Sequence, residues 1–92
     1  MSIQKNVRVV ELGPSAYTDI DIRLILKYSL DLLASSLIIC HNHPSGNLNP
    51  SEADNRITKK IQESGKLMDI QLLDHIIVGD NSYFSYADNG LI

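Results

Sequence analysis

The feature that most restricts the fold of this 92-residue chain is a short apolar run that ends in a pair of histidines. Residues 36–41 read Ser-Leu-Ile-Ile-Cys-His, and such a compact, β-branched run is typical of a buried strand. The chain continues through Asn42 and His43 into Pro-Ser-Gly-Asn, which has the composition of a turn. The pattern therefore predicts a buried strand whose carboxyl end carries two histidines beside a turn.

Three other segments have the pattern of strands, at residues 7–12, 70–78 and 83–86. A Gly-Pro pair closes the first segment, and Gly-Asp-Asn-Ser between the last two has the chemistry of a hairpin turn. Two helices are expected between the strands. The order β-α-β-α-β-β predicts helices packed on a mixed sheet, which is an α/β layer fold.

Both helices are expected from apolar residues that recur with a helical period. Asp19 or Asp21 can cap the first helix, which should end near Ala34, and Ser51 should open the second. A late glycine, Gly65, is expected to end the second helix or weaken its last turn. The predicted inward positions are Ile22, Ile25, Leu26, Leu32 and Leu33 in the first helix, and Ala53, Ile57 and Ile61 in the second.

The composition is that of a soluble globular protein, with 43% hydrophobic and 21% charged residues, and the length suits a single domain over residues 1–92. No apolar run is long enough for a transmembrane helix, and residues 1–6 lack the apolar segment of a signal peptide. The single cysteine, Cys40, excludes an internal disulfide and fits a reducing compartment. We therefore expect a cytoplasmic protein that does not bind membranes.

The net charge of −3 argues against a surface that binds nucleic acid, because phosphate contacts require clustered Lys and Arg. Four cationic residues do gather on the second predicted helix, but a solvated helix face explains them more simply. They are Arg56, Lys59, Lys60 and Lys66.

The two histidines suggest a metal site. His41 and His43 are two residues apart on a strand, so their side chains share one face, and Asp54 lies in the first turn of the next helix. Two imidazoles and one carboxylate leave a fourth position open for water, which is the pattern of a catalytic zinc site. Zinc lowers the pKa of its water to near neutrality and polarises a substrate carbonyl. Cys40 faces the opposite way, and we interpret it as a small core residue.

Ser51 and Asp54 also have a purely structural interpretation. S-x-x-D before an apolar helix stripe resembles a capping box, in which both side chains bond to free backbone N–H groups. Ser51 can cap the helix and still hydrogen-bond a metal-bound water or an oxyanion. For the histidines the structural alternative is a pair of polar residues bonded to the backbone at a strand end.

The spacing H-x-H, seven residues, then S-x-x-D resembles the JAMM motif of the JAB/MPN metallopeptidases, and His41, His43, Ser51 and Asp54 fill it without gaps. The sequence H-N-H-P-S-G at residues 41–46 is similar to sequences of the bacterial RadC branch of that family. So are Leu-Asp-His-Ile-Ile-Val-Gly at residues 73–79, Tyr-Phe-Ser at 83–85 and Asp-Ile-Arg-Leu-Ile at 21–25. The resemblance covers about residues 18 to 92.

This resemblance implies a cytidine-deaminase-like fold of α/β/α layers around a mixed sheet, and one Zn²⁺ held by His41, His43 and Asp54. It implies hydrolysis of an amide bond in a peptide or isopeptide substrate, with Ser51 stabilising the tetrahedral intermediate. RadC proteins carry a historical DNA-repair label that does not describe a chemistry. A DNA-repair accessory protein is therefore an alternative function, which the acidic charge does not favour.

The chain departs from the family pattern in one respect. JAMM enzymes use a glutamate on an early strand as general base, and by this resemblance the first strand or two of the domain are missing here. Glu11 is the only glutamate before the motif, and it is either a candidate base or a solvated strand end. Loss of a general base costs typically about 10²–10⁴-fold in rate. A catalytically impaired metal-binding or scaffold module is therefore a second alternative.

Two further expectations concern the surroundings of the site. A missing strand leaves a sheet edge open, so we expect pairing with another chain or with the N-terminal segment to cover it, and a homo-oligomer is one way to do so. His75 should share a strand face with Leu73 and Ile77, and so be enclosed and hydrogen-bonded. Asp74 can orient a ligating histidine, although a structural role is favoured for both residues.

Overall fold

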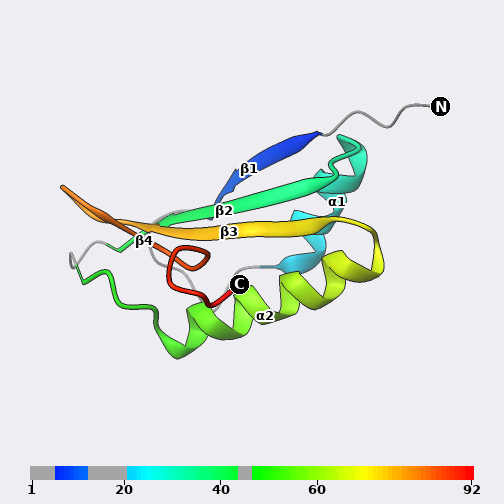
Figure 1. The fold of residues 1–92 in the computed structure, drawn as a ribbon. Coiled ribbons are helices and arrows are strands. Elements are labelled where there is room, and N and C mark those ends of the chain that lie inside the picture. Colours follow the sequence, from blue (N-terminus) through cyan, green and yellow to red (C-terminus); the bar gives the residue numbers. More distant parts are fainter. Residues whose placement is uncertain (1–5, 13–20, 44–46) are drawn as a thin grey trace.

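The protein is an α/β structure in which a sheet carries two helices. The computed structural model describes residues 6–12, 21–43 and 47–92. Its elements, in chain order, are β1 (Val7–Glu11), α1 (Ile22–Asp31), β2 (Ser36–Asn42), α2 (Glu52–Leu67), β3 (Gln71–Val78) and β4 (Tyr83–Ser85) (Figure 1). The predicted element order and the α/β class are confirmed. None of the helices described here is long and apolar enough to cross a membrane.

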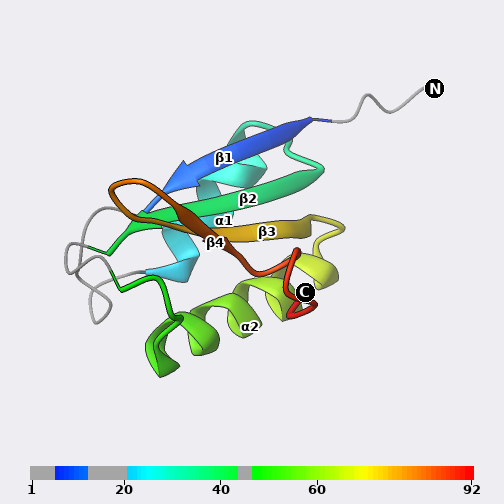
Figure 2. The same cartoon turned by 60° about the vertical axis from the view of Figure 1, so that its left-hand side comes forward.

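The sheet is mixed, as predicted. Its strands lie in the order β1-β2-β3-β4, with β1, β2 and β3 parallel and β4 antiparallel to β3. Within the described ranges both helices pack on the same face, because one buried core joins Ile25 of α1 and Ile61 of α2 to Leu37 and Ile39 of β2. Figure 2 shows the other face of the sheet turned toward the viewer, with α1 behind it. Successive crossovers that step in one direction along a sheet place their helices on one face, given the fixed crossover hand.

Helix α1 begins where expected and ends earlier than expected. Asp21 is its N-cap and accepts a hydrogen bond from the backbone N–H of Arg23, whereas Asp19 lies outside the described residues. The last helical residue is Asp31, not a residue near Ala34. Leu33 then takes a left-handed φ of 54° and is 83% exposed, so its predicted inward position is wrong.

The chain leaves both helices through the same hydrogen-bonded turn. After α1 the N–H of Ala34 donates to the carbonyl of Ser29 at 2.8 Å, and after α2 the N–H of Ile70 donates to the carbonyl of Gly65 at 2.8 Å. These are the long bonds of Schellman motifs. Gly65 therefore does not end α2, which continues to Leu67. A Cβ at this position would lie 2.4 Å from the carbonyl oxygen of Ile70, so a glycine permits the close return of the chain.

A bulge in β3 decides which of its residues face the core. Leu37 pairs with Leu72, but the next residue of β2, Ile38, pairs with Asp74, which leaves Leu73 as an extra residue. The extra residue reverses the alternation, so Leu72 faces the core before it and His75 after it. The prediction that Leu73 shares the face of His75 is therefore wrong in register, although His75 and Ile77 are both enclosed as predicted.

The face of the sheet opposite the two helices carries half-buried and exposed side chains. Val7 and Val9 of β1 are both exposed, and Cys40 is only half-buried, so the interpretation of Cys40 as a core residue is wrong. Its predicted orientation away from His41 agrees with the alternation along β2. In the described sheet β1 forms one edge. Cover of that edge by another segment or copy stays a prediction.

Candidate metal centre

The two predicted histidines lie at the carboxyl end of β2 and are both buried. His41 belongs to the strand and His43 follows it, with its backbone N–H donating to the carbonyl of Val78 at 3.2 Å. The alternation along the strand directs both imidazoles to the helix-covered face, where they lie 4.8 Å apart between ring centroids. The predicted Pro-Ser-Gly turn at residues 44–46 lies outside the described residues.

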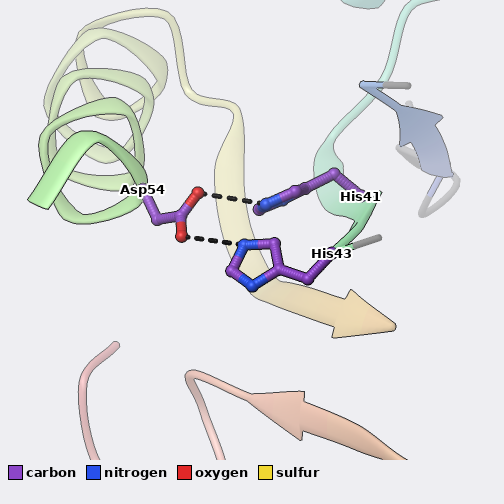
Figure 3. A group of neighbouring side chains, drawn as sticks. All are labelled: His41, His43 and Asp54. Atoms are coloured by element: carbon purple, nitrogen blue, oxygen red, sulfur yellow. Dashed lines mark ion pairs between the residues drawn. The ribbon is translucent and has the colours of Figure 1, made fainter. Parts of the chain in front are cut away.

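Asp54 comes to the same place from the start of α2, and its residue is only 1% exposed. Its Oδ1 lies 3.0 Å from Nε2 of His41, and its Oδ2 lies 3.2 Å from Nε2 of His43 (Figure 3). One ligand atom from each of the three residues lies within 4.8 Å of the others. The structure thus brings together the three residues that the motif spacing predicted as metal ligands.

The chemistry of these donors fits a metal cation. Nδ1 of His43 lies 2.5 Å from the carbonyl oxygen of Asn47, which can only accept, so Nδ1 carries the proton. In the neutral ring Nε2 is then a lone pair that faces the Asp54 carboxylate. Burial lowers the pKa of His41, against the opposing effect of Asp54, and so favours its neutral form. Lone pairs that converge on a buried carboxylate suit a cation such as Zn²⁺, which accepts both imidazole nitrogen and carboxylate oxygen.

Ser51 is the N-cap of α2, as predicted. Its Oγ accepts from the N–H of Asp54 at 3.0 Å, and its own N–H donates to Oδ2 of Asp54 at 2.7 Å, which completes a capping box. The same carboxylate oxygen faces His43. The capping box therefore also holds the carboxylate in the orientation that faces the histidines.

None of the three glutamates of the chain faces His41, His43 and Asp54, which we call the triad. Glu11 pairs in register with Cys40, so it shares the sheet face opposite His41. Glu52 lies in the first turn of α2, but its side chain is 95% exposed and is 3.9 Å from Arg56. Glu63 is an exposed residue farther along α2. The structure therefore gives no support to Glu11 as the general base.

A third histidine, His75, contacts the ring of His41 on the side away from Asp54. His75 is 1% exposed, and its Nε2 lies 2.9 Å from Nδ1 of His41. Its Nδ1 lies 2.6 Å from the hydroxyl of Thr58. Desolvation by burial, reinforced by the nearby His41, lowers the pKa of His75 to about 4. The ring also stacks on Tyr86, with centroids 4.7 Å apart and an angle of 3° between the planes.

Sequence reasoning missed Thr58 and Tyr86. The buried face of α2 runs through Asp54, Thr58, Ile61 and Gly65, whereas apolar periodicity favoured Ala53, Ile57 and Ile61. One available signal was that Thr58 lies one helical turn after Asp54 and so shares its face. Nothing local marked Tyr86, which reaches the site from beyond β4.

Asp74 has a structural role, and its carboxylate bonds to Ser85 and Ala87 instead of to a metal-ligating histidine. Its carboxylate accepts from the hydroxyl of Ser85 at 2.6 Å and from the N–H of Ala87 at 2.9 Å. These bonds tie the end of β4 and the residues that follow it to β3, on either side of Tyr86, which stacks on His75. The favoured structural interpretation of Asp74 agrees with these contacts.

Comparison with known proteins adds to this geometry. The model of the RadC-like JAB domain matches residues 4–91. The chain belongs to this family. The match includes all three members of the triad together with Ser51 and His75, so the motif and the site lie in one RadC-like JAB domain.

Several bacterial relatives share this RadC-like domain. A UPF0758 protein of Flavobacterium johnsoniae is 49% identical over 79 residues, which is 86% of this chain and 34% of that protein. A UPF0758 protein of Porphyromonas gingivalis is 44% identical over 81 residues, covering 87% of this chain and 36% of the relative. One from Clostridium botulinum is 43% identical over 91 residues, or 99% of this chain and 40% of the relative. The chain thus spans little more than a third of the length of these relatives.

Proposed function

We propose that this RadC-like JAB domain binds one Zn²⁺ and acts in the hydrolysis of an amide bond in a peptide or isopeptide substrate. The observation that supports this proposal is the convergence of His41, His43 and Asp54 on one buried point, with ligand atoms within 4.8 Å of one another. A buried carboxylate beside two imidazoles is costly to desolvate unless a cation compensates it.

Each residue has a separate task in this proposal. Nε2 of His41, Nε2 of His43 and the carboxylate of Asp54 hold the ion, while the backbone N–H of Ser51 holds Oδ2 of Asp54 in place. When bound, zinc supplies a Lewis acid and a hydroxide source at neutral pH. The Ser51 hydroxyl, next to Asp54, is the candidate donor to an oxyanion of the substrate.

The placement of the glutamates limits the expected rate. Since Glu11, Glu52 and Glu63 are all directed away from the triad, none of these glutamates is positioned as a base for proton transfer in the part of the chain that the structure describes. We therefore expect hydrolysis to be slower by about 10²–10⁴-fold than in a site that includes such a base. The same observation favours a second candidate function, a module that holds a metal ion without hydrolysing a substrate.

Metal analysis of the purified chain tests the ion site. We expect about one zinc per chain in the wild type, and loss of zinc in Asp54→Asn, which removes the anionic ligand and keeps the side-chain shape. Asp31→Asn is the matched control, because Asp31 is an exposed aspartate that pairs with Lys27 in the last turn of α1. Equal zinc in the wild type and Asp54→Asn would exclude Asp54 as a ligand and contradict the proposal.

A hydrolysis assay separates the two functions. A fluorogenic peptide with a lysine isopeptide bond should be cleaved slowly by the zinc-loaded chain, and cleavage should stop after chelation. Zinc binding without any zinc-dependent cleavage would support the non-catalytic module instead.

A further inference from the structure

A buried chain of three hydrogen bonds runs behind the triad. The Thr58 hydroxyl lies 2.8 Å from the backbone carbonyl oxygen of Asp54 and 2.6 Å from Nδ1 of His75. Nε2 of His75 lies 2.9 Å from Nδ1 of His41. Thr58 and His75 are 4% and 1% exposed, so solvent does not replace these partners.

The direction of each bond follows from the first. The carbonyl of Asp54 can only accept, so the single hydroxyl proton of Thr58 is donated to it. The Thr58 oxygen must then accept from His75, which places the ring proton of His75 on Nδ1. Nε2 of a neutral His75 is left as a lone pair, and it accepts from Nδ1 of His41. His41 consequently presents the lone pair of its Nε2 to Asp54.

We infer that His75 and Thr58 are positioning residues that hold His41 in the Nδ1–H tautomer, with Nε2 ready to bind a cation. The inference rests on the cation site proposed above. It assigns a task to two buried polar residues that are not among the three proposed ligands.

This chain of hydrogen bonds, called the relay below, is needed because Asp54 favours the other tautomer of His41, with the proton on Nε2. Its Oδ1 lies 3.0 Å from Nε2 of His41, and a carboxylate at that distance favours a proton on the facing nitrogen. A metal ion would have to displace that proton before it could bind. Because Nε2 of His75 accepts a hydrogen bond from Nδ1–H of His41, the proton of His41 stays on Nδ1 and its Nε2 remains available to a cation. Hydrogen-bond partners of ligating histidines commonly have this effect.

The surrounding structure holds the His75 ring in this role. The bulge at Leu73 turns His75 toward the core, and the stacked Tyr86 ring limits its rotation. The Tyr86 hydroxyl donates to Oδ1 of Asn55 at 2.7 Å, which fixes the stacking ring to the first half of α2.

A pair of Thr58 variants tests the inference. Thr58→Val has nearly the same shape but no oxygen, so Nδ1 of His75 loses its acceptor, whereas Thr58→Ser keeps the hydroxyl. Long-range ¹H–¹⁵N spectra of the metal-free full chain, labelled in histidine, report the tautomer of His41 directly. We expect the Nδ1–H form in the wild type and Thr58→Ser, and a shift toward Nε2–H in Thr58→Val.

Zinc affinity gives a second measurement. Titration against a competing chelator dye should show about 10–100-fold weaker binding in Thr58→Val and binding close to wild type in Thr58→Ser. A wild-type His41 in the Nε2–H form would overturn the inference, and so would a Thr58→Val variant with wild-type tautomer and affinity. An Nδ1–H form of His41 in a chain that binds no zinc would leave the relay standing and refute the proposed ion site alone.

Discussion

Ser51 and Asp54 hold each other by two reciprocal hydrogen bonds, from Ser51 N–H to the Asp54 carboxylate at 2.7 Å and from Asp54 N–H to the Ser51 hydroxyl at 3.0 Å. The two interpretations suggested by S-x-x-D are therefore compatible in one structure. The same carboxylate that caps the helix faces the histidines, so stability of the α2 start and geometry of the site are coupled.

Replacing Ser51 with alanine should therefore destabilise the protein and weaken the site. Loss of the hydroxyl acceptor is expected to lower the free energy of unfolding by about 1 kcal/mol, measured by urea denaturation. Zinc affinity should fall as well, because Asp54 loses its anchor. Ser51→Thr keeps the hydroxyl and should retain most of both properties. An alanine variant with unchanged stability would argue against the cap.

Zinc should stabilise the folded chain. A ligand that binds only the native state at about 100 times its Kd adds about 2.7 kcal/mol to the free energy of unfolding. We expect a higher Tm in the presence of zinc, reversed by a chelator. His43→Gln should respond weakly, because it lacks the ligating Nε2. The same rise in Tm for both proteins would show that zinc acts elsewhere.

Replacing Leu33 with glycine should stabilise the protein. Leu33 is the residue of the α1 terminal turn that takes a φ of 54°, and it is 83% exposed, so it is strained without contributing much packing. Relief of a left-handed leucine is expected to contribute about 1 kcal/mol. Asp69, with a φ of 57° after α2, offers the comparison, because aspartate tolerates this conformation better than leucine does. Asp69→Gly should therefore gain less. A destabilised Leu33→Gly variant would contradict this account.

Tyr86 should make the protein sensitive to alkaline pH. Burial raises the pKa of its phenol to about 12. The folded state therefore keeps a proton that the unfolded chain releases near pH 10. The resulting stability is complete below pH 10 and is lost as the pH rises toward 12. The free energy of unfolding, measured at pH 9 and at pH 11, should decrease more between these two values for the wild type than for Tyr86→Phe. Parallel slopes would refute the assignment.

Much of the fold could be predicted because its signals are local. Strand and helix periods, the Ser51 cap and the hairpin turn all depend on residues a few positions apart. The three candidate ligands were also found from local spacing, because His41 and His43 must share a strand face and Asp54 must lie in the first turn of the following helix. The end of α1 was missed because apolar periodicity gives no sign of the turn that ends this helix. The left-handed position of such a turn usually holds glycine, but here it holds Leu33.

The sequence by itself determined the order of the elements and the identity of the histidines and aspartate that meet. Only the tertiary structure decided what surrounds them. The bulge at Leu73 turned His75 toward His41, and the parallel register of β1 with β2 directed Glu11 away from the site. Both outcomes depend on how distant strands align, and a shift of one residue in that alignment moves a side chain to the other face of the sheet without changing any local pattern.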